Sequence, residues 1–379
     1  MIDRTEMVID LLKKLVSIDS VNPCLSPRHR GEGEIADFVA ERLRSIGADV
    51  RKQKVVDDRN NVIGVIRGNE RGRKLLIVAH LDTVGVDSMI IPPFQPVIAG
   101  NRLYGRGSAD NKGGMAAAIE ALRLLSLDCN FKGDVIFAGT VDEEYEAKGI
   151  ENLVQEIKAD AAIVIEPVGF NVMVAHKGFA WQEFKVMGRA AHGSDFVNGI
   201  DAIFETQKLL AELIKMNDEL MKHPHPLLGP ASLHASQIHG GEGWSTYPAE
   251  CVLTVERRTL PGETKLKVEK EFLDITDRLL EEGIHVETKM HFFRVATEIS
   301  PNEIIVQSLL KAASEAGINC SVSGMSAWPE AGVLNLSGIP SVVFGPSGCK
   351  GHESDEYVEL DSITKCSEVL EKAIRIFLS

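Results

Sequence analysis

The sequence predicts an α/β fold: a largely parallel, helix-flanked sheet with a smaller α+β lid or dimerisation domain inserted into it. Two observations predict this. Up to about residue 177, and again from about residue 294, nearly continuous apolar runs alternate with amphipathic helical patterns, which is typical of buried parallel strands and their crossover helices. Between residues 178 and 293 the strand-like runs alternate apolar and polar side chains, as strands do when one face is exposed.

The first segment, residues 1–177, is expected to form most of the main sheet. Its helices follow from apolar residues at helical spacing, and its strands from short runs rich in β-branched residues. Gly47 is expected to end the second helix, because glycine readily adopts the left-handed conformation that closes a helix. The predicted helices are 1–17, 35–50, 113–127 and 151–160, and the predicted strands are 60–68, 74–82, 134–144 and 161–169.

The inserted segment, residues 178–293, follows the order strand-helix-strand-strand-helix-strand, which indicates a separate α+β module. The last segment, residues 294–379, returns to the first pattern, with a helix from about Pro301, a strand and a final helix to Ser379. The predicted strands are 179–188, 231–240, 249–260 and 339–348, and the predicted helices of the insert are 199–222 and 263–283.

The composition is that of an ordinary globular protein, since 44% of the 379 residues are hydrophobic and 25% are charged. A net charge of −14 argues against a surface for nucleic acid or for an anionic membrane, because both need clustered lysine and arginine. No apolar run approaches the roughly 18 residues of a membrane span, and the charged N-terminus has no secretory cleavage site. Six scattered cysteines without a Cys-x-x-Cys pair favour free thiols. We therefore expect a cytoplasmic protein.

Ionisable side chains follow almost every predicted strand of the main sheet. Binding sites in open parallel sheets lie just outside the carboxyl ends of the strands, so these side chains are expected to meet. Two histidines among several carboxylates match the ligand preference of zinc, and a pair of metals sharing one carboxylate would use them all. The residues are His80, Asp82, Asp110, Glu143, Glu144, Glu166 and His352.

Each of these features has a simpler reading when taken alone. A histidine at a strand end is more often a hydrogen-bonded structural residue, and an adjacent pair of glutamates is usually a solvated turn. The glycine-rich loop "YGRGSADNKGG" resembles a nucleotide cradle, but it lacks the third glycine of a dinucleotide fingerprint and the Gly-Lys-Ser/Thr ending of a P-loop. Five coincidences at one sheet edge are less plausible than a single metal site.

The motifs also carry a family resemblance that covers nearly the whole chain. The sequence resembles the dinuclear-zinc amidohydrolases and metallopeptidases that include acetylornithine deacetylase, succinyl-diaminopimelate desuccinylase, aminoacylase and glutamate carboxypeptidase. That family has an α/β metal domain and an inserted lid or dimerisation domain. The motifs that carry the resemblance, in order along the chain, are "AHLDTV", "GRGSADNKGG", "DEE", "IEP", "GRAAHGSD", "ERRTLPGE" and "GHESDEYV".

The resemblance implies a role for each strand-end residue. Asp110 would bridge two metals, with His80 and Glu166 completing the ligands of one, and Glu144 and His352 those of the other. Asp82 would accept a hydrogen bond from the His80 ring and fix its tautomer. Glu143 would be the general base beside a metal-activated water that attacks an amide carbonyl. The family's cis peptide would fall at Asp110–Asn111.

Four further residues are implied as substrate contacts. His192 resembles the lid histidine that reaches a neighbouring active site in dimeric relatives, and Arg258 resembles the arginine that grips a substrate carboxylate. Arg257 precedes it, and strand alternation lets only one of the two face a site. Two positions depart from the family pattern. Ser245 stands where many relatives have asparagine, and Glu330 stands where relatives often have aspartate, to meet a substrate amine or to shape the pocket wall.

Several functions remain open at this point. The favoured one is a metal-dependent deacylase of N-acyl amino acids with a free carboxylate. The alternative is a di- or tripeptidase or carboxypeptidase that uses the same dinuclear site. A non-catalytic binding protein is disfavoured because every ligand position and Glu143 are present, and nucleotide binding is disfavoured by the incomplete glycine motif. The expected cofactors are two zinc ions per chain, with cobalt or manganese as substitutes, and the expected partner is a second copy of the chain bound through the inserted domain.

Overall fold

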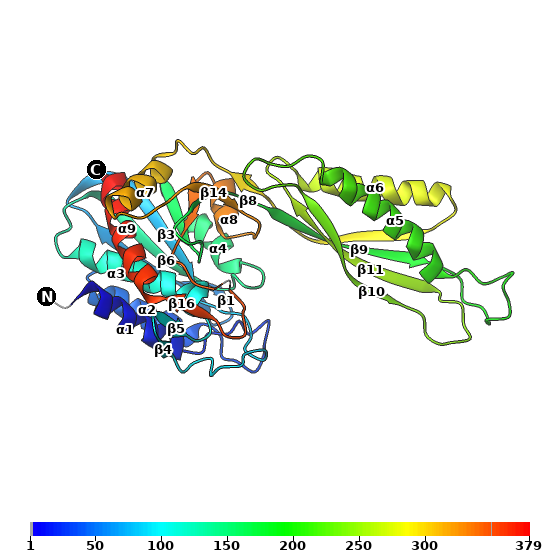
Figure 1. The fold of residues 1–379 in the computed structure, drawn as a ribbon, viewed down its shortest axis with the longest axis horizontal. Helices are drawn as coiled ribbons and strands as arrows, with labels where there is room; N and C mark the ends of the chain where they lie inside the picture. Colours follow the sequence, from blue (N-terminus) through cyan, green and yellow to red (C-terminus); the bar gives the residue numbers. More distant parts are fainter. Residues whose placement is uncertain (1–2, 350) are drawn as a thin grey trace. The chain divides into compact units, whose positions relative to one another are not determined.

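The computed structural model describes residues 3–349 and 351–379, and these form two compact units. The first unit comprises 1–174, 299–323 and 329–379, and the second comprises 175–298 and 324–328. The expected α/β class is confirmed, with a large mixed sheet flanked by helices (Figure 1). The sequence pattern places the insert at 178–293, inside the second unit, and assigns 324–328 to the main domain.

The main sheet is parallel at its centre and antiparallel towards its edges. Its strand order is β1-β2-β6-β3-β7-β15-β8-β13, with β14 beside β8. The neighbours among β6, β3, β7 and β15 pair in parallel, whereas the pairs β1–β2, β2–β6, β15–β8 and β8–β13 are antiparallel. The predicted parallel arrangement is therefore found at the centre of the sheet. The strands are β1 (Asp49–Val56), β2 (Arg59–Arg67), β3 (Glu70–His80), β6 (Lys132–Thr140), β7 (Ala161–Ile165), β8 (Val172–His176), β13 (Thr297–Glu298), β14 (Val322–Met325) and β15 (Ser341–Phe344).

The parallel strands carry their buried residues up to their carboxyl ends. In β3 the first five residues are exposed and the last six, through His80, are buried, whereas all five residues of β7 are buried. The register pairs His80 with Thr140 of β6 and Val78 with Val164 of β7. The chain therefore leaves β3, β6 and β7 at the same edge of the sheet, which brings the residues after these strands together.

Helices pack on the sheet through the apolar stripes that the sequence predicts. α2 packs on β1 and β2, α9 on β3, and α8 on β15, while α9 also contacts both α3 and α7. The described helices of this unit are α1 (Arg4–Ser17), α2 (Gly33–Ser45), α3 (Gly114–Ser126), α4 (Lys148–Glu156), α7 (Ile304–Glu315), α8 (Ala331–Leu336) and α9 (Leu360–Leu378). The first two residues of the predicted N-terminal helix lie outside the described residues.

Several parts of the first unit differ from the sequence prediction, which did not include β8 and α8. The helix predicted over 35–50 ends at Ser45, because Gly47 turns the chain with a φ of +86°, and residues from Asp49 form β1. A small antiparallel sheet of order β16-β5-β4 was not predicted, because its strands have only three residues each. These are β4 (Val97–Ala99), β5 (Arg102–Tyr104) and β16 (Tyr357–Glu359), and the π-helical turn η1 (Ser108–Gly113) follows β5.

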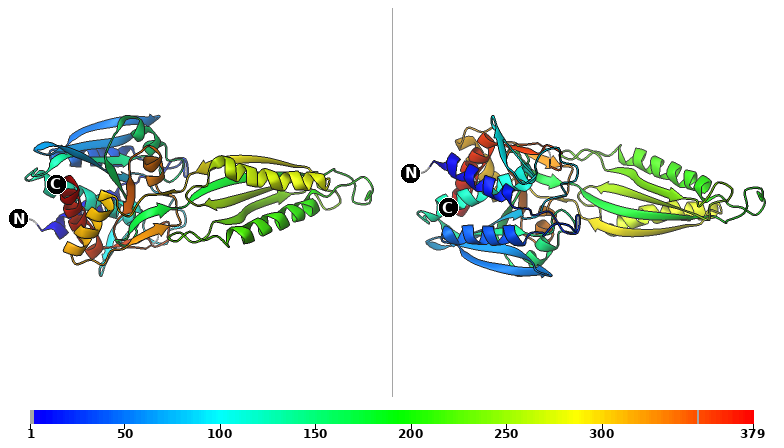
Figure 2. Two further views of the ribbon diagram at one scale, coloured as in Figure 1. Left: turned by 90° about the horizontal axis from the view of Figure 1, so that it is seen from above. Right: turned by 90° about the horizontal axis from the view of Figure 1, so that it is seen from below.

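The second unit is a four-stranded antiparallel sheet with two helices on one face, as Figure 2 shows from above and below. Its strand order is β10-β11-β9-β12, and the alternating residues that face the helices form its core with apolar side chains of α5 and α6. The predicted succession of strands and helices is confirmed. The elements are β9 (Gly178–Met187), α5 (Ala202–Leu220), β10 (Ser232–Gly240), β11 (Glu250–Thr259), α6 (Lys265–Glu281) and β12 (Val286–Arg294).

Among the described residues, none of the helices combines the length and the apolar character that crossing a membrane requires.

His176, at the end of β8, gives the fold a dependence on pH. The ring is 3% exposed, with Nδ1 3.0 Å from the Lys177 carbonyl oxygen and Nε2 2.7 Å from the Thr297 hydroxyl. Burial lowers the pKa of His176 from 6.5 to about 4, against the raising effect of the Lys177 carbonyl. The folded state therefore favours the neutral ring. Its contribution to stability is complete above the unfolded pKa and declines as the pH falls from 6.5 towards 4.

We expect His176→Asn to remove this dependence. Between about pH 7 and about pH 5 the wild type should lose about 2 kcal/mol more free energy of unfolding than the variant. Urea denaturation at both pH values measures the free energy of unfolding of each protein. Carboxylates elsewhere are the same in both proteins, so their pH dependence cancels in the comparison. His223→Asn is the matched control, since that side chain is 78% exposed, and it should behave as the wild type. Equal losses in His176→Asn and wild type would contradict the assignment.

Candidate metal centre

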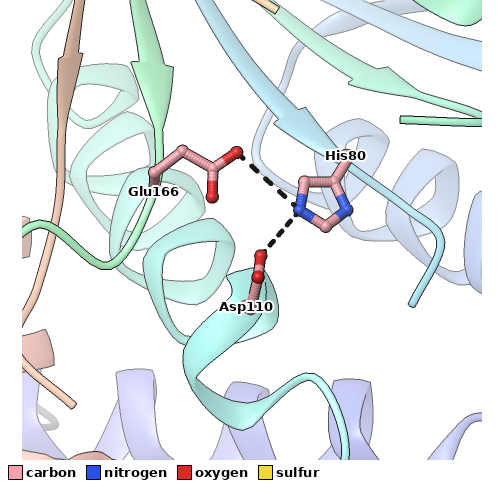
Figure 3. A group of neighbouring side chains, drawn as sticks. All are labelled: His80, Asp110 and Glu166. Atoms are coloured by element: carbon pink, nitrogen blue, oxygen red, sulfur yellow. Dashed lines mark hydrogen bonds and ion pairs between the residues drawn. The ribbon is translucent and has the colours of Figure 1, made fainter. Parts of the chain in front are cut away.

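Three side chains from separate segments meet beyond the carboxyl ends of β3 and β7. His80 is the last residue of β3, Glu166 directly follows β7, and Asp110 lies in η1 (Figure 3). The His80 Nε2 atom lies 3.0 Å from Asp110 Oδ1 and 3.8 Å from Glu166 Oε1. His80 and Glu166 are 1% and 8% exposed. The structure thus brings together the three residues expected to hold one metal.

A second set shares Asp110 with the first. His352 Nε2 lies 3.0 Å from Glu144 Oε2 and 3.6 Å from Asp110 Oδ2, so the two oxygens of Asp110 face different histidines. His352 has a φ of +73°, and this left-handed turn belongs to the loop between β15 and β16. An aspartate placed between two histidines in this way is the arrangement that a bridging carboxylate requires.

The two sets fit a pair of cations. One potential ligand atom from each member lies within 4.8 Å of the others in the groups His80–Asp110–Glu166, Asp110–Glu144–His352 and His80–Glu143–Glu144. Imidazole nitrogens and carboxylate oxygens are the usual donors to zinc, and cobalt and manganese accept the same donors. The Glu144 Oε1 atom is buried and has no hydrogen-bond partner among the described residues. A cation would satisfy this orphaned oxygen.

The carboxylates crowd one another, which also favours a cation. Burial raises the pKa of Glu143 well above its ordinary range, and the charges of Glu144 and Asp110 add to the rise while His80 opposes it. Burial and the charge of Asp110 raise the pKa of Glu166 in the same way. Burial alone would lower the pKa of His80, but the hydrogen bond to Asp110 and the nearby glutamates hold it well above its usual value. Divalent cations would relieve this repulsion among buried carboxylates.

Asp82 occupies a different place from the one predicted. The His80 Nδ1 atom lies 2.9 Å from the backbone carbonyl oxygen of Asp82, whereas the nearer carboxylate oxygen is 3.7 Å away. The carboxylate instead accepts the backbone N–H groups of Glu143 at 3.1 Å and Glu144 at 3.0 Å. The tautomer of His80 is therefore fixed by a backbone oxygen, and the Asp82 side chain holds the turn that carries Glu143 and Glu144.

Glu356 is a residue of the site that the sequence interpretation missed. Its carboxylate is fully buried and accepts the Arg106 guanidinium at 2.7 Å and the backbone N–H groups of Gly107, Ala109 and Asp110 at 2.9 to 3.0 Å. These donors all belong to the turn that leads into Asp110, and Glu356 follows His352 by four residues. Glu356 therefore ties the bridging aspartate to the His352 loop. Both "GRGSADNKGG" and "GHESDEYV" contain one partner of the buried ion pair, which was the only signal available.

The turn at Asp110 is also tied to β7. The peptide bond between Asp110 and Asn111 is cis, which confirms the expectation from the family. The Asn111 side chain is buried and donates to the Ile165 carbonyl oxygen at 2.9 Å, one residue before Glu166. The positions of two ligands in the first set are thus coupled through a single amide.

Arg257 and Arg258 in β11 face opposite sides of the second-unit sheet. Arg257 is fully buried, and its guanidinium donates to Glu263 at 2.6 Å and to Glu271 at 3.0 Å, so it has a structural role. The Arg258 side chain is 32% exposed; it donates to Glu256 at 2.7 Å and lies over the Phe179 ring. Burial and ion pairing thus exclude Arg257 as a ligand contact, and substrate binding by Arg258 stays a prediction.

His192 and Ser245 lie on two neighbouring exposed segments of the second unit. His192 and Thr246 form an isolated antiparallel bridge, and Gly193 donates its backbone N–H to the Ser245 carbonyl at 2.7 Å. The His192 ring contacts the Ser194 hydroxyl at 2.7 Å through Nδ1. The structure brings these two predicted residues together within their unit, and their contact with a substrate stays a prediction.

The surroundings of Glu330 favour one of the two roles that the sequence left open. Its side chain has no exposed surface and accepts the Thr140 hydroxyl at 2.9 Å, at the end of β6. Burial raises its pKa to about 7, while His80 and the Thr140 hydroxyl lower it. A fully buried carboxyl offers no face to a substrate amine, so the structure favours the alternative in which Glu330 shapes the wall behind the site.

Comparison with known proteins decides the family. The family model for peptidases M20/M25/M40 matches residues 76–376, a span that includes every residue of both ligand sets. The chain belongs to peptidase family M20/M25/M40. The resemblance inferred from the motifs is confirmed, and so is the enzyme class, because this family consists of metallopeptidases and amidohydrolases.

Relatives within the M20 family are named for different activities. The chain is 27% identical to an acetylornithine deacetylase from Myxococcus xanthus, over 97% of this chain and 96% of that one. A tripeptidase from Staphylococcus aureus has the same fold, with a TM-score of 0.82, 22% identity and coverage of 99% and 98%. A dinuclear metal-binding M20 peptidase from Bacillus subtilis has a TM-score of 0.76, 17% identity and coverage of 99% and 98%. The fold and family therefore leave the substrate open.

We expect Glu356→Gln to lower the free energy of unfolding by about 3 to 5 kcal/mol, because it leaves the buried Arg106 guanidinium without a charged partner. Urea denaturation of the metal-free protein measures the loss. Glu353→Gln is the matched control: this exposed neighbour offers Arg106 only its backbone carbonyl, so its side chain should matter by less than about 0.5 kcal/mol. Equal stabilities of the two variants would show that Glu356 does not anchor the turn.

Proposed function

We propose that this chain is a dinuclear-metal deacylase that removes the acyl group from N-acyl amino acids with a free carboxylate. The observation that carries the proposal is the pair of ligand sets that share Asp110, with Glu143 in a group that reaches both. The deacylase is preferred because the chain resembles an acetylornithine deacetylase over nearly its full length. A di- or tripeptidase is the second candidate, and the fold likeness to a tripeptidase favours it.

The proposed ligands are His80, Asp110 and Glu166 for one metal, and Asp110, Glu144 and His352 for the other. We propose zinc as the physiological metal, with cobalt or manganese as functional substitutes. When bound, the pair supplies a water molecule whose pKa is lowered towards about 7, so that it can act as the nucleophile. The hydrogen bond from His80 Nδ1 to the Asp82 carbonyl leaves the Nε2 lone pair for the metal.

Glu143 has the position and the surroundings of a general base. It belongs to the group His80–Glu143–Glu144, while its backbone N–H is held by the Asp82 carboxylate. In the proposed reaction its carboxylate takes the proton from the water as the amide carbonyl is attacked, and delivers that proton to the leaving nitrogen. The amide bond breaks, and the products are the carboxylic acid of the acyl group and the free amino acid.

Substrate recognition is proposed to fall to Arg258, His192 and Ser245 in the second unit. The guanidinium of Arg258 would bind the carboxylate of the amino acid, since its planar fork suits two parallel hydrogen bonds. His192 would donate to the carbonyl oxygen as charge develops on it. Ser245 would contribute a hydroxyl where relatives carry an amide.

We also propose a homodimer formed through the second unit, and a cytoplasmic location. β10 lies at the edge of its sheet with most of its residues exposed, and an unpaired edge strand is a template for pairing with another chain. Ile238 on β10 and Ile214 on α5 are 51% and 60% exposed, which supports a partner on this side. All six cysteines are free, as expected in a reducing compartment.

The first test is hydrolysis of N-acetyl amino acids and of di- and tripeptides by metal-stripped protein, with and without added zinc. We expect zinc to restore acetate release, with the peptides left intact. Glu143→Ala should bind two zinc ions and show no turnover, which separates its role from that of a ligand. Cleavage of peptides alone would favour the peptidase over the deacylase. No activity on either panel, with two zinc ions bound, would exclude both substrate classes.

Arg258→Ala tests the carboxylate contact. Loss of a charge-assisted hydrogen bond of about 1.5 to 3 kcal/mol should raise KM about tenfold to a hundredfold for substrates with a free carboxylate. The same variant should be indistinguishable from wild type on carboxamide analogues, because they lack the charge. Arg278→Ala on α6, a side chain 54% exposed, is the control. An unchanged KM for the carboxylate substrates would remove Arg258 from this role.

A further inference from the structure

We propose that Asn22 and Arg59 are positioning residues that fix the turn carrying Glu143 and Glu144, and so control binding of the metal on the Glu144 side. The inference rests on the proposed dinuclear centre, but not on which substrate is cleaved. Neither residue belongs to a motif by which the family was recognised, and neither contacts a proposed metal ligand through its side chain. Their effect is exerted through two buried aspartates, Asp82 and Asp142.

The turn needs support from outside itself. β6 ends at Thr140, and Asp142 adopts a φ of +70°, a left-handed conformation that costs a non-glycine residue about 1 kcal/mol or more. The Asp142 carbonyl accepts the backbone N–H of Ala147 at 2.6 Å, which closes the turn around Glu143 and Glu144. These two residues lie in no helix or strand, so side chains must fix their positions.

Asn22 supplies a link between the two aspartates. Its Nδ2 atom donates to Asp82 Oδ2 at 2.8 Å and to Asp142 Oδ1 at 3.1 Å, and all three side chains are buried. Asp82 in turn accepts the backbone N–H groups of Glu143 and Glu144. The side-chain amide of Asn22 therefore fixes the position of the Asp82 carboxylate, which in turn holds the backbone of Glu143 and Glu144.

The orientation of this amide is itself fixed. Asn22 Oδ1 accepts the backbone N–H of Cys24 at 3.0 Å, and the Asn22 backbone N–H donates to the Thr83 carbonyl at 2.9 Å. The amide NH₂ is thus directed at the two aspartates by independent contacts. A hydrogen-bond acceptor in place of the amide NH₂ would face the buried carboxylates of Asp82 and Asp142, and their negative charges would repel it.

Arg59 binds Asp142, the second of the two aspartates that Asn22 links. Its guanidinium donates to Asp142 Oδ1 at 3.0 Å and binds both oxygens of Glu32, one of them at 2.8 Å. Glu32 also accepts the Asp142 backbone N–H at 3.1 Å. Glu32 and Asp142 are fully buried and Arg59 is 7% exposed. Arg59 neutralises part of the charge that Glu32, Asp142 and Asp82 would otherwise place beside the metal centre.

Among the described residues, the side-chain hydrogen bonds of this network lead to the turn of Glu143 and Glu144. Asp82 also contacts the other ligand set, but through its backbone carbonyl, which lies 2.9 Å from His80 Nδ1 directly after β3. Glu144 is attached to the turn, whereas His80 ends β3, Glu166 follows β7, and Asp110 is held by Glu356. A change at Asn22 or Arg59 is therefore expected to displace Glu143 and Glu144 and leave the His80–Asp110–Glu166 set intact. This asymmetry distinguishes a positioning role from a general contribution to folding.

The experiment is a Co²⁺ titration of metal-free protein, followed by calorimetry and by visible absorption. Wild type is expected to bind two ions. Asn22→Asp, which keeps the size and reverses the polarity of the link, should retain one tight site and bind the second ion about 10- to 100-fold more weakly, with kcat reduced by a similar factor and KM unchanged. The absorption of the first bound ion should match that of wild type. Asn152→Asp on α4, whose side chain donates only to a helix carbonyl, is the matched control and should titrate as wild type.

Arg59→Lys is the second variant, because it keeps the charge and loses the planar fork. It should weaken the second Co²⁺ less than Arg59→Met does. Two equal tight sites in Asn22→Asp, or equal weakening of both sites in all these variants, would overturn the proposal. Because the titration needs no substrate, a wild type that binds two ions and cleaves neither substrate panel would refute the proposed function while this inference stands. A wild type that binds fewer than two ions would refute both.

Discussion

The repulsion among buried carboxylates at one edge of the sheet is the constraint on which the rest of the structure depends. The parallel strands β6 and β7 lead to Glu143, Glu144 and Glu166 at the same edge of the sheet, and η1 adds Asp110. Only two histidines stand among them. Such a cluster is stable when cations or protons compensate it, so the fold has to hold these groups together against their own charges.

The clustered carboxylates are held in place by hydrogen-bond acceptors as well as by donors. Two ligand-bearing turns are each anchored by a carboxylate that is not itself a proposed ligand. Glu356 accepts three backbone N–H groups before and at Asp110, and Asp82 accepts two at Glu143 and Glu144. Turns that lack a hydrogen-bonding ladder have spare backbone donors, and a buried carboxylate satisfies several at once. Arg106 and Arg59 then offset the added charge. Part of the acidic character of the chain is therefore structural and internal.

The meeting of His80, Glu143, Glu144 and Glu166 was predictable from the sequence because parallel strands end at one edge of a sheet. The assignment of ligands to two metals came from the family resemblance and stays a proposal. The anchoring residues were not predictable, because their contacts join loops whose paths no local pattern specifies: Glu356 and Arg106 are 250 positions apart, and Asn22 and Asp142 are 120 apart. The role of Asp82 was misassigned for a related reason. At two residues from His80, either its carbonyl or its carboxylate can reach the ring, and the backbone of a distant turn decides between them. β1 was missed because its pattern is mostly exposed and resembles the end of a surface helix.

The residues proposed for chemistry and those proposed for recognition fall into different units of the chain. Every proposed metal ligand and Glu143 belong to the first unit, whereas Arg258, His192 and Ser245 belong to the second. Glu330, the one first-unit residue expected to contact substrate, is fully buried. Under the proposed roles, a substitution in the second unit would change substrate binding and leave every proposed metal ligand in place. Under this proposal, the metal ligands identify the type of reaction, whereas the acyl group that is removed depends on residues of the second unit.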